Sequence, residues 1–389
     1  MVRVLHVVES AKGGVPLFVR RVCEGLRQGF EFEIACPPLS ELYLRPPTNA
    51  VVHPVGMARQ FHPLRDPASA RRIRRLLQSN PYDIVHLNSS KAGILGLLLG
   101  DGFPAKTVFT PHALRSNAYA DGSVLRRVAL FIEARICRAV DLIVAVSQEE
   151  QRQVIESGMA PPDRVRLIEN GVDLSGLSTP PALTRADVGL PPEAFVVGTV
   201  GRLSPQKDPI TFVRAAVSMA GQVPRAHFVL VGDGPLEADV RRLIVGRGLS
   251  HQFHLLGWRS DATEVLKLLD VFVLTSHYEG MPFVLLEAAG ARRPIVCTAA
   301  PGVRSLIQDE SSGLVTEIGD WRGLATAVRR LYERPDERSR LAEAAFQTVA
   351  LPRGLDVMVE GWGTLYRTVA EEAASLAAAR PRRLLVAGR

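Results

Sequence analysis

The chain has 389 residues, of which 47% are hydrophobic and 22% are charged, and its formal net charge is +7. This apolar content suffices for two or three domain cores and excludes an intrinsically disordered protein, and the longest apolar run, residues 92–100, is about half of what a membrane span needs. Aromatic residues make up only 6%, which argues against a stacking platform for nucleic acid, so we expect no nucleic-acid partner.

The N-terminus and the cysteines bear on localisation. Residues 1–6 read Met-Val-Arg-Val-Leu-His, which favours a charged strand start over a signal peptide. The four cysteines lie far apart without a C-x-x-C pair and are expected to be free thiols of a reducing cytoplasm. They are Cys23, Cys36, Cys137 and Cys297.

In the first half of the chain, short apolar runs alternate with segments that space apolar residues as a helix does. In chain order the predicted strands are Val4–Val8, Glu31–Cys36, Ile84–Leu87, Thr107–Thr110, Leu142–Val146 and Val165–Ile168. Apolar strands joined by crossover helices are typical of parallel sheets covered on both faces. We therefore expect a Rossmann-like α/β domain over residues 1–175.

The same rhythm returns in residues 194–366, which we expect to be a second α/β domain. Its predicted strands are Phe195–Gly201, His227–Val231, Phe253–Leu256, Val271–Leu274 and Ile295–Cys297, and its predicted helices are Ile210–Met219, Pro235–Val245 and Pro282–Ala291. Residues 176–193 lie in a stretch rich in Pro, Gly, Ser and Thr and are predicted to be a linker. From Trp321 to about Ala379 the pattern is helical. Two such domains usually bind ligand where the carboxyl ends of their strands face each other.

Three turns at predicted strand ends of the first domain are candidate site elements. Gly13 and Gly14 follow the first strand and open a helix, where backbone can approach an anion, although an ordinary tight turn stays open. His112, in Thr-Pro-His-Ala just beyond a strand, would lie on the ligand-facing rim, whereas most isolated histidines are structural. Asn170 and Gly171 form a strong turn signal before the linker and are a candidate hinge or cleft wall.

The second domain carries two charged pairs. Arg202 and Lys207 leave its first strand end five residues apart, and such a pair suits a diphosphate, although two solvated charges stay open. Glu279 lies in the loop before a helix that Pro282 would start. Glu287 follows on that helix among Leu and Ala, so it would face partly inward, and its burial is costly unless a group such as a ribose diol donates to it.

Several motifs are missing. The sequence has no D-x-D, no Cys/His cluster with metal-ligand spacing, no G-x-S-x-G elbow, no G-x-x-x-x-G-K-[ST] loop and no G-x-G-x-x-G. We therefore expect neither a metal ion nor a cofactor.

Taken together, the motifs resemble the family-four retaining glycosyltransferases with the GT-B fold, the group 1 type, over essentially the whole chain. The anchors are Gly13-Gly14, Ser89–Gly93, Thr110–His112, Val146-Ser147, Asn170–Asp173, Gly201–Leu203, Lys207, Gly232–Pro235, Leu256-Gly257 and the E-x(7)-E element from Glu279 to Glu287. The Ser89–Gly93 and Thr110–His112 segments most resemble bacterial enzymes of capsule and exopolysaccharide assembly. Ser305 departs from the glutamate that the family often has there.

The resemblance implies two Rossmann-like domains facing across a cleft, with a last helix, about residues 367–389, that crosses back to the first domain. Arg202 and Lys207 would hold the donor diphosphate. Glu287 would bind the ribose, and Glu279 would contact the sugar near its anomeric carbon. His112 would bind a sugar hydroxyl or stabilise the oxocarbenium charge. The implied donor site also includes Gly280, Met281, Pro282, Gly13 and Gly14.

The activity implied is metal-independent transfer of a sugar, with retention, from a nucleotide-diphosphate donor. UDP is favoured over GDP, and the acceptor would be a lipid-linked or cell-envelope glycan, reached from the cytoplasm at the inner face of the membrane. Three alternatives stay open: a small-molecule glycosyltransferase of secondary metabolism, a sugar-nucleotide epimerase and a non-catalytic nucleotide-sugar-binding protein.

An anionic membrane surface is a further partner that the sequence suggests. Four arginines between residues 71 and 75 crowd one predicted helix, and Ile73, Leu76 and Leu77 share a face of it. The alternative is a solvated helix with that face in the core. The last ten residues add four arginines and no acid.

Overall fold

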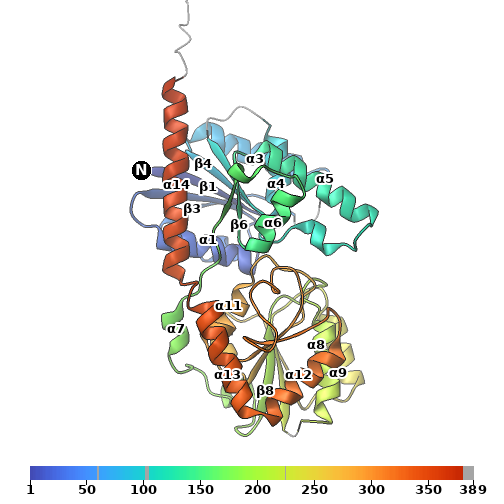
Figure 1. Ribbon diagram of the computed structural model, residues 1–389. Coiled ribbons are helices and arrows are strands. Elements are labelled where there is room, and N and C mark those ends of the chain that lie inside the picture. Colours follow the sequence, from blue (N-terminus) through green and yellow to red (C-terminus); the bar gives the residue numbers. More distant parts are fainter. Residues whose placement is uncertain (59–60, 101–104, 224, 380–389) are drawn as a thin grey trace, which may run out of the picture.

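The computed structural model describes residues 1–58, 61–100, 105–223 and 225–379. It contains two α/β domains, one above the other in Figure 1, with the longest helix running along the side of the upper, first domain. Within the described ranges no helix is long and apolar enough to cross a bilayer.

The first domain is built on seven parallel strands in the order β3-β2-β1-β4-β5-β6-β7. The strand order reverses beside β1, and in open α/β sheets ligands bind at the carboxyl ends of the strands next to such a point. The strands are β1 Val2–Val8, β2 Phe30–Cys36, β3 Ala50–Pro54, β4 Ile84–Asn88, β5 Lys106–Thr110, β6 Leu142–Ala145 and β7 Val165–Leu167.

Helices cover both faces of this sheet. Alternate strand residues point to opposite faces, so Val7, Leu87 and Phe109 pack under α3, α4 and α5, whereas Val4 and Val108 pack under α1 and α14. The helices of this domain are α1 Gly14–Gly25, α2 Glu41–Leu44, α3 Arg65–Ser79, α4 Ser90–Leu99, η1 Arg115–Ala118, α5 Val124–Ala139, α6 Gln148–Glu156 and η2 Pro162–Arg164.

The second domain has six parallel strands in the order β10-β9-β8-β11-β12-β13, and its order reverses between β8 and β11. Its strands are β8 Phe195–Val200, β9 Ala226–Val231, β10 Phe253–Gly257, β11 Val271–Leu274, β12 Ile295–Thr298 and β13 Leu314–Thr316. Its helices are α7 Leu174–Ser178, η3 Ala186–Val188, α8 Pro209–Ala220, α9 Glu237–Gly246, α10 Ala262–Leu266, α11 Phe283–Gly290, α12 Trp321–Glu333, α13 Pro335–Ala345 and η4 Phe346–Ala350.

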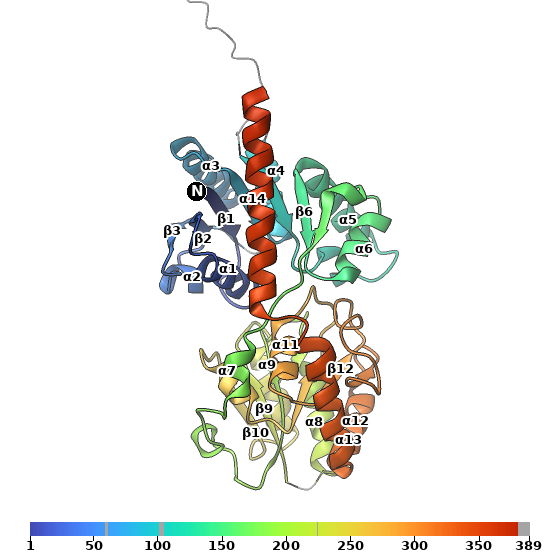
Figure 2. The ribbon, with the colours of Figure 1, turned by 60° about the vertical axis from the view of Figure 1, so that its left-hand side comes forward.

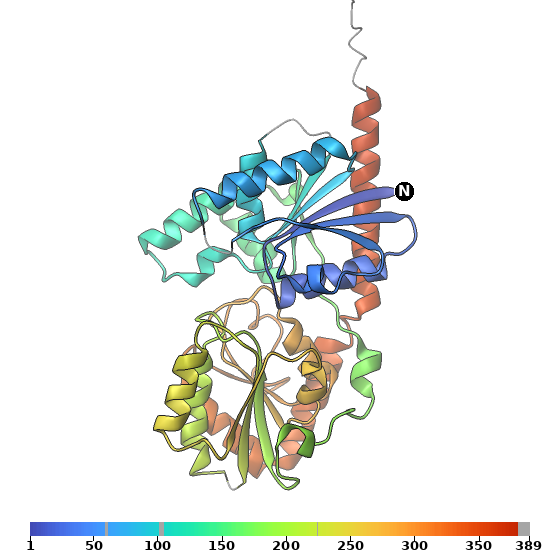
Figure 3. The same ribbon diagram turned by 180° about the vertical axis from the view of Figure 1, so that it is seen from behind.

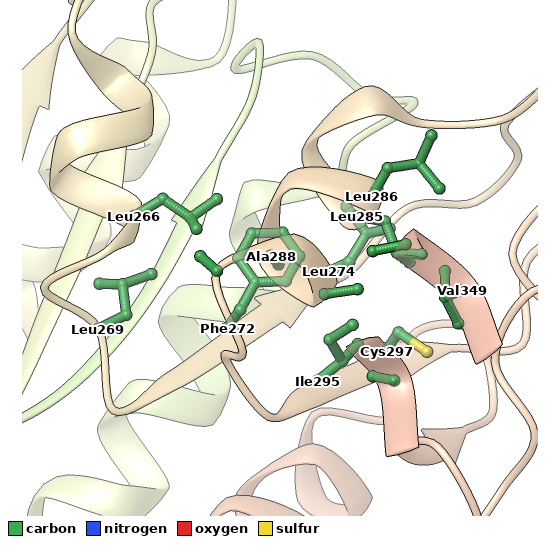
Figure 4. Close-up of a cluster of buried hydrophobic side chains, with 14 of the residues drawn as sticks. Leu266, Leu269, Phe272, Leu274, Leu285, Leu286, Ala288, Ile295, Cys297 and Val349 are labelled. Carbon is green, nitrogen blue, oxygen red and sulfur yellow. The ribbon is translucent and has the colours of Figure 1, made fainter. Parts of the chain in front are cut away.

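One core of the second domain lies between its sheet and helix α11. Figure 4 shows Phe272 and Leu274 of β11 beside Leu285 and Ala288 of the helix, with Val349 of η4 closing the other side. Because both sides of the loop 275–282 are anchored in buried elements, this core fixes where Glu279 and Glu287 lie.

The last helix crosses back to the first domain, as the resemblance implies. It is α14, Leu355–Ala379, so the prediction that it starts at about 367 is wrong. Trp362 and Tyr366 are fully buried against α1, in the same cluster as Phe18. Residues 355–366 therefore pack with the first domain. Residues 380–389, with their arginines, lie outside the described residues.

Three other predictions need correction. Edge strands β3 and β13 were not predicted. The stretch 176–193 is not a free linker, because α7 and η3 lie in it and Leu177, Val188 and Leu190 are buried in the second domain's core. On α3, Ile73 and Leu77 are buried, so the alternative is confirmed: its apolar face lies in the core. All four cysteines are free, as predicted, and the structure places them in buried positions.

Candidate active site

Lys207 and Glu279 form an ion pair at the carboxyl ends of β8 and β11. The Lys207 Nζ lies 2.5 Å from the Glu279 Oε1, and the Ser276 hydroxyl donates to the same oxygen. The Glu279 backbone N–H donates to the Pro301 carbonyl at 2.8 Å, and its side chain is only 7% exposed. The sequence predicted that these groups meet one donor molecule. The structure places them in contact with each other.

Backbone contact brings this pair to the first domain. A Cβ added to Gly280 would lie 2.8 Å from the carbonyl carbon of His112, so only glycine permits this approach. Gly302, with φ +78, is pressed in the same way against the Glu279 carbonyl oxygen. His112 and Ala113 themselves have positive φ, 57° and 128°, a strained conformation of the kind that gathers at functional sites.

The hydrogen bonds of Asn88 determine the tautomer of His112. The Asn88 Nδ2 donates to the carbonyl oxygen of His86 at 3.0 Å, and a carbonyl can only accept, so the Asn88 Oδ1 is the atom 3.2 Å from the His112 Nε2. The Nε2 therefore carries the proton and Nδ1 is an acceptor. Burial lowers the pKa of His112 to about 3, so the ring is neutral at physiological pH.

Glu287 has a partner that the sequence did not reveal. The Arg21 guanidinium, from α1 of the first domain, donates to the Glu287 Oε1 at 3.0 Å and to the Gly171 carbonyl at 3.0 Å, and it lies 4.7 Å from the Phe283 ring centroid. The predicted inward orientation of Glu287 is found, with 13% of the side chain exposed. The donor to its carboxylate is a protein cation.

The Asn170-Gly171 turn lies where the chain passes between the domains. The Asn170 Nδ2 donates to the Met281 carbonyl at 2.8 Å. A Cβ on Gly171 would lie 2.5 Å from the Gly354 carbonyl oxygen. Val172 and Gly354 form a β-bridge, so the connections into α7 and into α14 run side by side (Figure 2). The turn therefore packs closely where the chain passes between the domains, and its role as a hinge or cleft wall stays a prediction.

The Gly13-Gly14 turn faces the second domain. A Cβ on Gly14 would lie 3.7 Å from the Phe283 ring, whereas Gly13, with φ +97, has open space around it. Its neighbour Lys12 pairs with Asp233 at 2.6 Å and lies 5.2 Å from the Trp258 ring.

Trp258 extends this set of contacts to α2. Its Nε1 donates to the Glu41 Oε1 at 3.1 Å. Burial raises the pKa of Glu41 above its ordinary value, although Trp258 and two cations oppose this. None of these contacts was predicted, since they join residues more than 200 positions apart.

Arg202 follows Val200 and Gly201 at the end of β8 and is exposed. None of the carboxylates in the described part of the chain pairs with it. The next loop is fitted closely against this one, because a Cβ on Gly232 would lie 1.9 Å from the Gly201 carbonyl oxygen. Arg202 thus lies exposed at the strand end, without an ion-pair partner among the residues that the structure describes.

Two family models match the chain. The model for glycosyltransferase family 4 matches residues 12–175, and the model for glycosyl transferases group 1 matches residues 182–348. A UDP-Gal:α-D-GlcNAc-diphosphoundecaprenol α-1,3-galactosyltransferase of Escherichia coli is 32% identical over 78% of this chain and 80% of its own length.

The chain belongs to the family-four glycosyltransferases. A D-inositol 3-phosphate glycosyltransferase of a Nocardioides species is 29% identical to this glycosyltransferase over 72% of this chain and 67% of its own length. Among solved structures, HepE of Anabaena has a TM-score of 0.80 and 21% identity, covering 95% of this chain and all of HepE. The structural likeness establishes the GT-B fold of the glycosyltransferase.

The loop after β12 carries Ser305, where the resemblance led us to expect a glutamate. Ser305 is exposed there. The Gly302 N–H instead donates to the Glu149 Oε2 of the first domain at 2.7 Å. Among the residues that the structure describes, no three His, Cys, Asp or Glu side chains are grouped to hold a metal ion, and metal independence stays a prediction.

Proposed function

We propose that the protein is a retaining glycosyltransferase that moves a sugar from a UDP-sugar to a lipid-linked glycan intermediate, forming an α-linkage without a metal ion. The E. coli relative is named for a UDP-Gal donor and a diphosphoundecaprenol-linked acceptor, and HepE was solved with UDP and glucose. The observation that carries the proposal is the Lys207–Glu279 pair against the His112 backbone. A cation and a carboxylate of the second domain meet there beside the backbone of His112, whose imidazole hydrogen-bonds to Asn88.

Lys207 and Arg202 would act on the leaving diphosphate. Negative charge grows on its bridging oxygen as the bond to the sugar breaks, and cations already in place stabilise that charge most. The Lys207 side chain lies against Gly201, because a Cβ added to this glycine would be 3.7 Å from the lysine Cδ. Arg202 is exposed and can turn toward the phosphates. Glu287 would bind the ribose while Arg21 holds its Oε1.

Glu279 and His112 would face the sugar. Because Lys207 and Ser276 already donate to Glu279, its carboxylate is a weakened nucleophile. This favours a same-face reaction in which the leaving phosphate oxygen takes the proton of the acceptor hydroxyl. A covalent intermediate on Glu279 is the rival route. A neutral His112 can accept a hydrogen bond from a sugar hydroxyl at Nδ1 and, because it stays uncharged, does not repel the developing positive charge.

The reaction test uses the purified full chain with separate UDP- and GDP-sugars. Each donor is offered with GlcNAc-diphosphoundecaprenol, with inositol phosphate and with no acceptor, in the presence and absence of EDTA. We expect transfer from a UDP-sugar to the lipid-linked acceptor in EDTA, with an α-anomeric product by NMR.

The other outcomes identify the alternatives. Transfer to inositol phosphate alone would support a soluble acceptor, as the name of the Nocardioides relative suggests. Donor conversion without acceptor would indicate an epimerase, and UDP binding without turnover would indicate a non-catalytic protein. Loss of turnover in EDTA, restored by magnesium or manganese, would refute metal independence. Since the acceptor would be a membrane lipid, the proposal includes peripheral attachment to the inner face of the membrane.

A further inference from the structure

Helix α5 projects from the side of the first domain, together with the segment that precedes it (Figures 1 and 3). Its inner face is buried through Ala129, Ile136 and Cys137. The face on the opposite side of the helix is expected to be polar in a surface helix of this kind.

The outer face of α5 is instead apolar. Val124 is 72% exposed, Leu125 61%, Val128 49% and Phe131 67%. Positions 124, 128 and 131 lie on one side of a helix. Exposed apolar groups gathered on one helix face mark a surface that binds something, whereas single exposed ones need no explanation.

The charges on the same helix are almost all positive. Arg127, Arg135 and Arg138 are exposed, and Arg126 pairs with Asp121. The one acid of the helix, Glu133, is buried, 1% exposed, and points the other way. A projecting helix with apolar side chains between arginines has the chemistry that an anionic lipid surface binds.

The inner face of α5 connects this surface to the candidate active site. The Glu133 Oε1 accepts the backbone N–H of Arg115 and of Ser116, which lie shortly after His112 in the same loop. The helix that carries the outer face therefore also anchors, through its opposite face, the loop that follows His112.

We propose that the outer face of α5, formed by Val124, Leu125, Val128, Phe131, Arg127, Arg135 and Arg138, is a docking surface for an anionic phospholipid bilayer. The apolar side chains enter the headgroup region and the arginines contact the lipid phosphates. The proposal names the surface for the attachment included in the proposed function, and it moves this role from α3, whose apolar face is in the core.

The test is co-sedimentation of the full chain with vesicles of phosphatidylcholine alone or mixed with phosphatidylglycerol. We expect binding to the mixed vesicles only, weakened by salt. The V128S/F131S variant and the R127Q/R135Q/R138Q variant should each lower the partition coefficient about tenfold or more. Both change exposed side chains, and a thermal melt checks that they fold.

Helix α9 offers a control, because Arg241 and Arg242 on the helix and its C-cap Arg247 are exposed and Val245 is 63% exposed. The R241Q/R242Q/R247Q variant and the V245S variant should stay within about twofold of the unmodified protein. Unchanged vesicle binding in both α5 variants would overturn the proposal. So would a dimer without lipid that V128S/F131S converts to a monomer, since the face would then bind a second copy.

Turnover separates this proposal from the proposed function. With a short-chain, water-soluble acceptor analogue the α5 variants should keep full activity, and with acceptor in vesicles they should lose it. If no acceptor supports turnover but the α5 variants still lose vesicle binding, the surface assignment is right and the function is wrong.

Discussion

Among the contacts that join the domains, two sets differ in burial and in kind. The inner set lies at β5 and β11, where Gly280 is pressed against the His112 backbone and the Lys207–Glu279 pair has exposures of 22% and 7%. The outer set lies at β1 and β9, where Lys12 and Asp233 are 45% and 40% exposed.

The difference indicates different roles. At the inner set, the backbones of the two domains lie so close that no methyl group fits between them. This packing fixes the position of the inner set to within a fraction of an ångström. An exposed ion pair contributes little and opens easily. We infer that the inner set holds the reacting groups, whereas the outer set closes the domains and must yield when substrates enter.

The largest effect should come from the inner ion pair. Glu279→Gln removes the charge that meets the developing positive charge on the sugar, so kcat should fall about 10²–10³-fold with a smaller change in KM. Steady-state kinetics checks this, with a thermal melt for folding and Glu360→Gln, on the exposed side of α14, as control. A change in KM alone would reverse the roles of Glu279 and Glu287.

Gly280→Ala tests the close approach at the domain boundary. The new methyl group would lie 2.8 Å from the His112 carbonyl carbon, and a misplacement of about 1 Å can reduce kcat/KM up to about 10²-fold. Gly221→Ala is the control, since nothing lies within 4 Å of its Cβ. Equal activity of the two variants would show that the inner contact is not required.

Glu287→Gln and Arg21→Gln should raise the donor KM about tenfold while kcat changes little, because a ribose contact exists in the ground state and in the transition state. Expressed as free energy, the loss of donor binding in the double variant should be smaller than the sum of the losses in the two single variants, since the side chains are in contact. Full additivity in this cycle would contradict joint action of Arg21 and Glu287.

Asn88→Asp tests the neutral state of His112 through pH. Burial holds the pKa of His112 at about 3. The activity of the unmodified protein, plotted against pH, should therefore show no decrease above pH 4 that is caused by protonation of His112. A carboxylate at position 88 would favour the imidazolium and raise that pKa toward its ordinary value of about 6.5. Activity of the variant should then fall as pH decreases through this range, whereas Asn88→Ala should show no such fall.

The smallest effect is expected at the outer set. Lys12→Ala should change kcat/KM by about twofold, because exposed ion pairs are worth at most about 1 kcal/mol. The effect should shrink as salt concentration rises. A loss as large as that of Glu279→Gln would place Lys12 in the reaction itself and remove the distinction between the two sets.

Sequence reasoning found the residues that follow strands and missed those that meet them from elsewhere. His112, Lys207 and Glu279 each follow an apolar run, and parallel strands send their carboxyl ends to one edge. Arg21 stands beside Arg20 on a helix and looks like any solvated charge until the second domain is placed against it. Asn88 ends β4, and this strand-end position is the signal that was available for it. The roles of all these residues stay predictions.

The two parallel sheets and their covering helices were predicted from the sequence, whereas the edge strands, the buried residues of the stretch between the domains and the start of α14 were not. Strand β3 has a 59% exposed Val51 and β13 spans Leu314–Thr316, so neither contains the long apolar run that marks a central strand. Leu177 and Leu190 stand among prolines and glycines without a period, so their burial could not be predicted. The start of α14 at Leu355 was missed because α13, η4 and α14 all have helical patterns.

The packing of α14 has a consequence for how the protein is made. Trp362 and Tyr366, from the end of the chain, complete the core around Phe18, and the Tyr366 hydroxyl lies 2.7 Å from the His86 Nδ1. On the ribosome the first domain is synthesised first, yet its core lacks these side chains until nearly the whole chain has emerged. The second domain can fold while the first still has an open apolar groove for a chaperone to cover, and a nascent chain that stops before α14 should leave the N-terminal half unfinished.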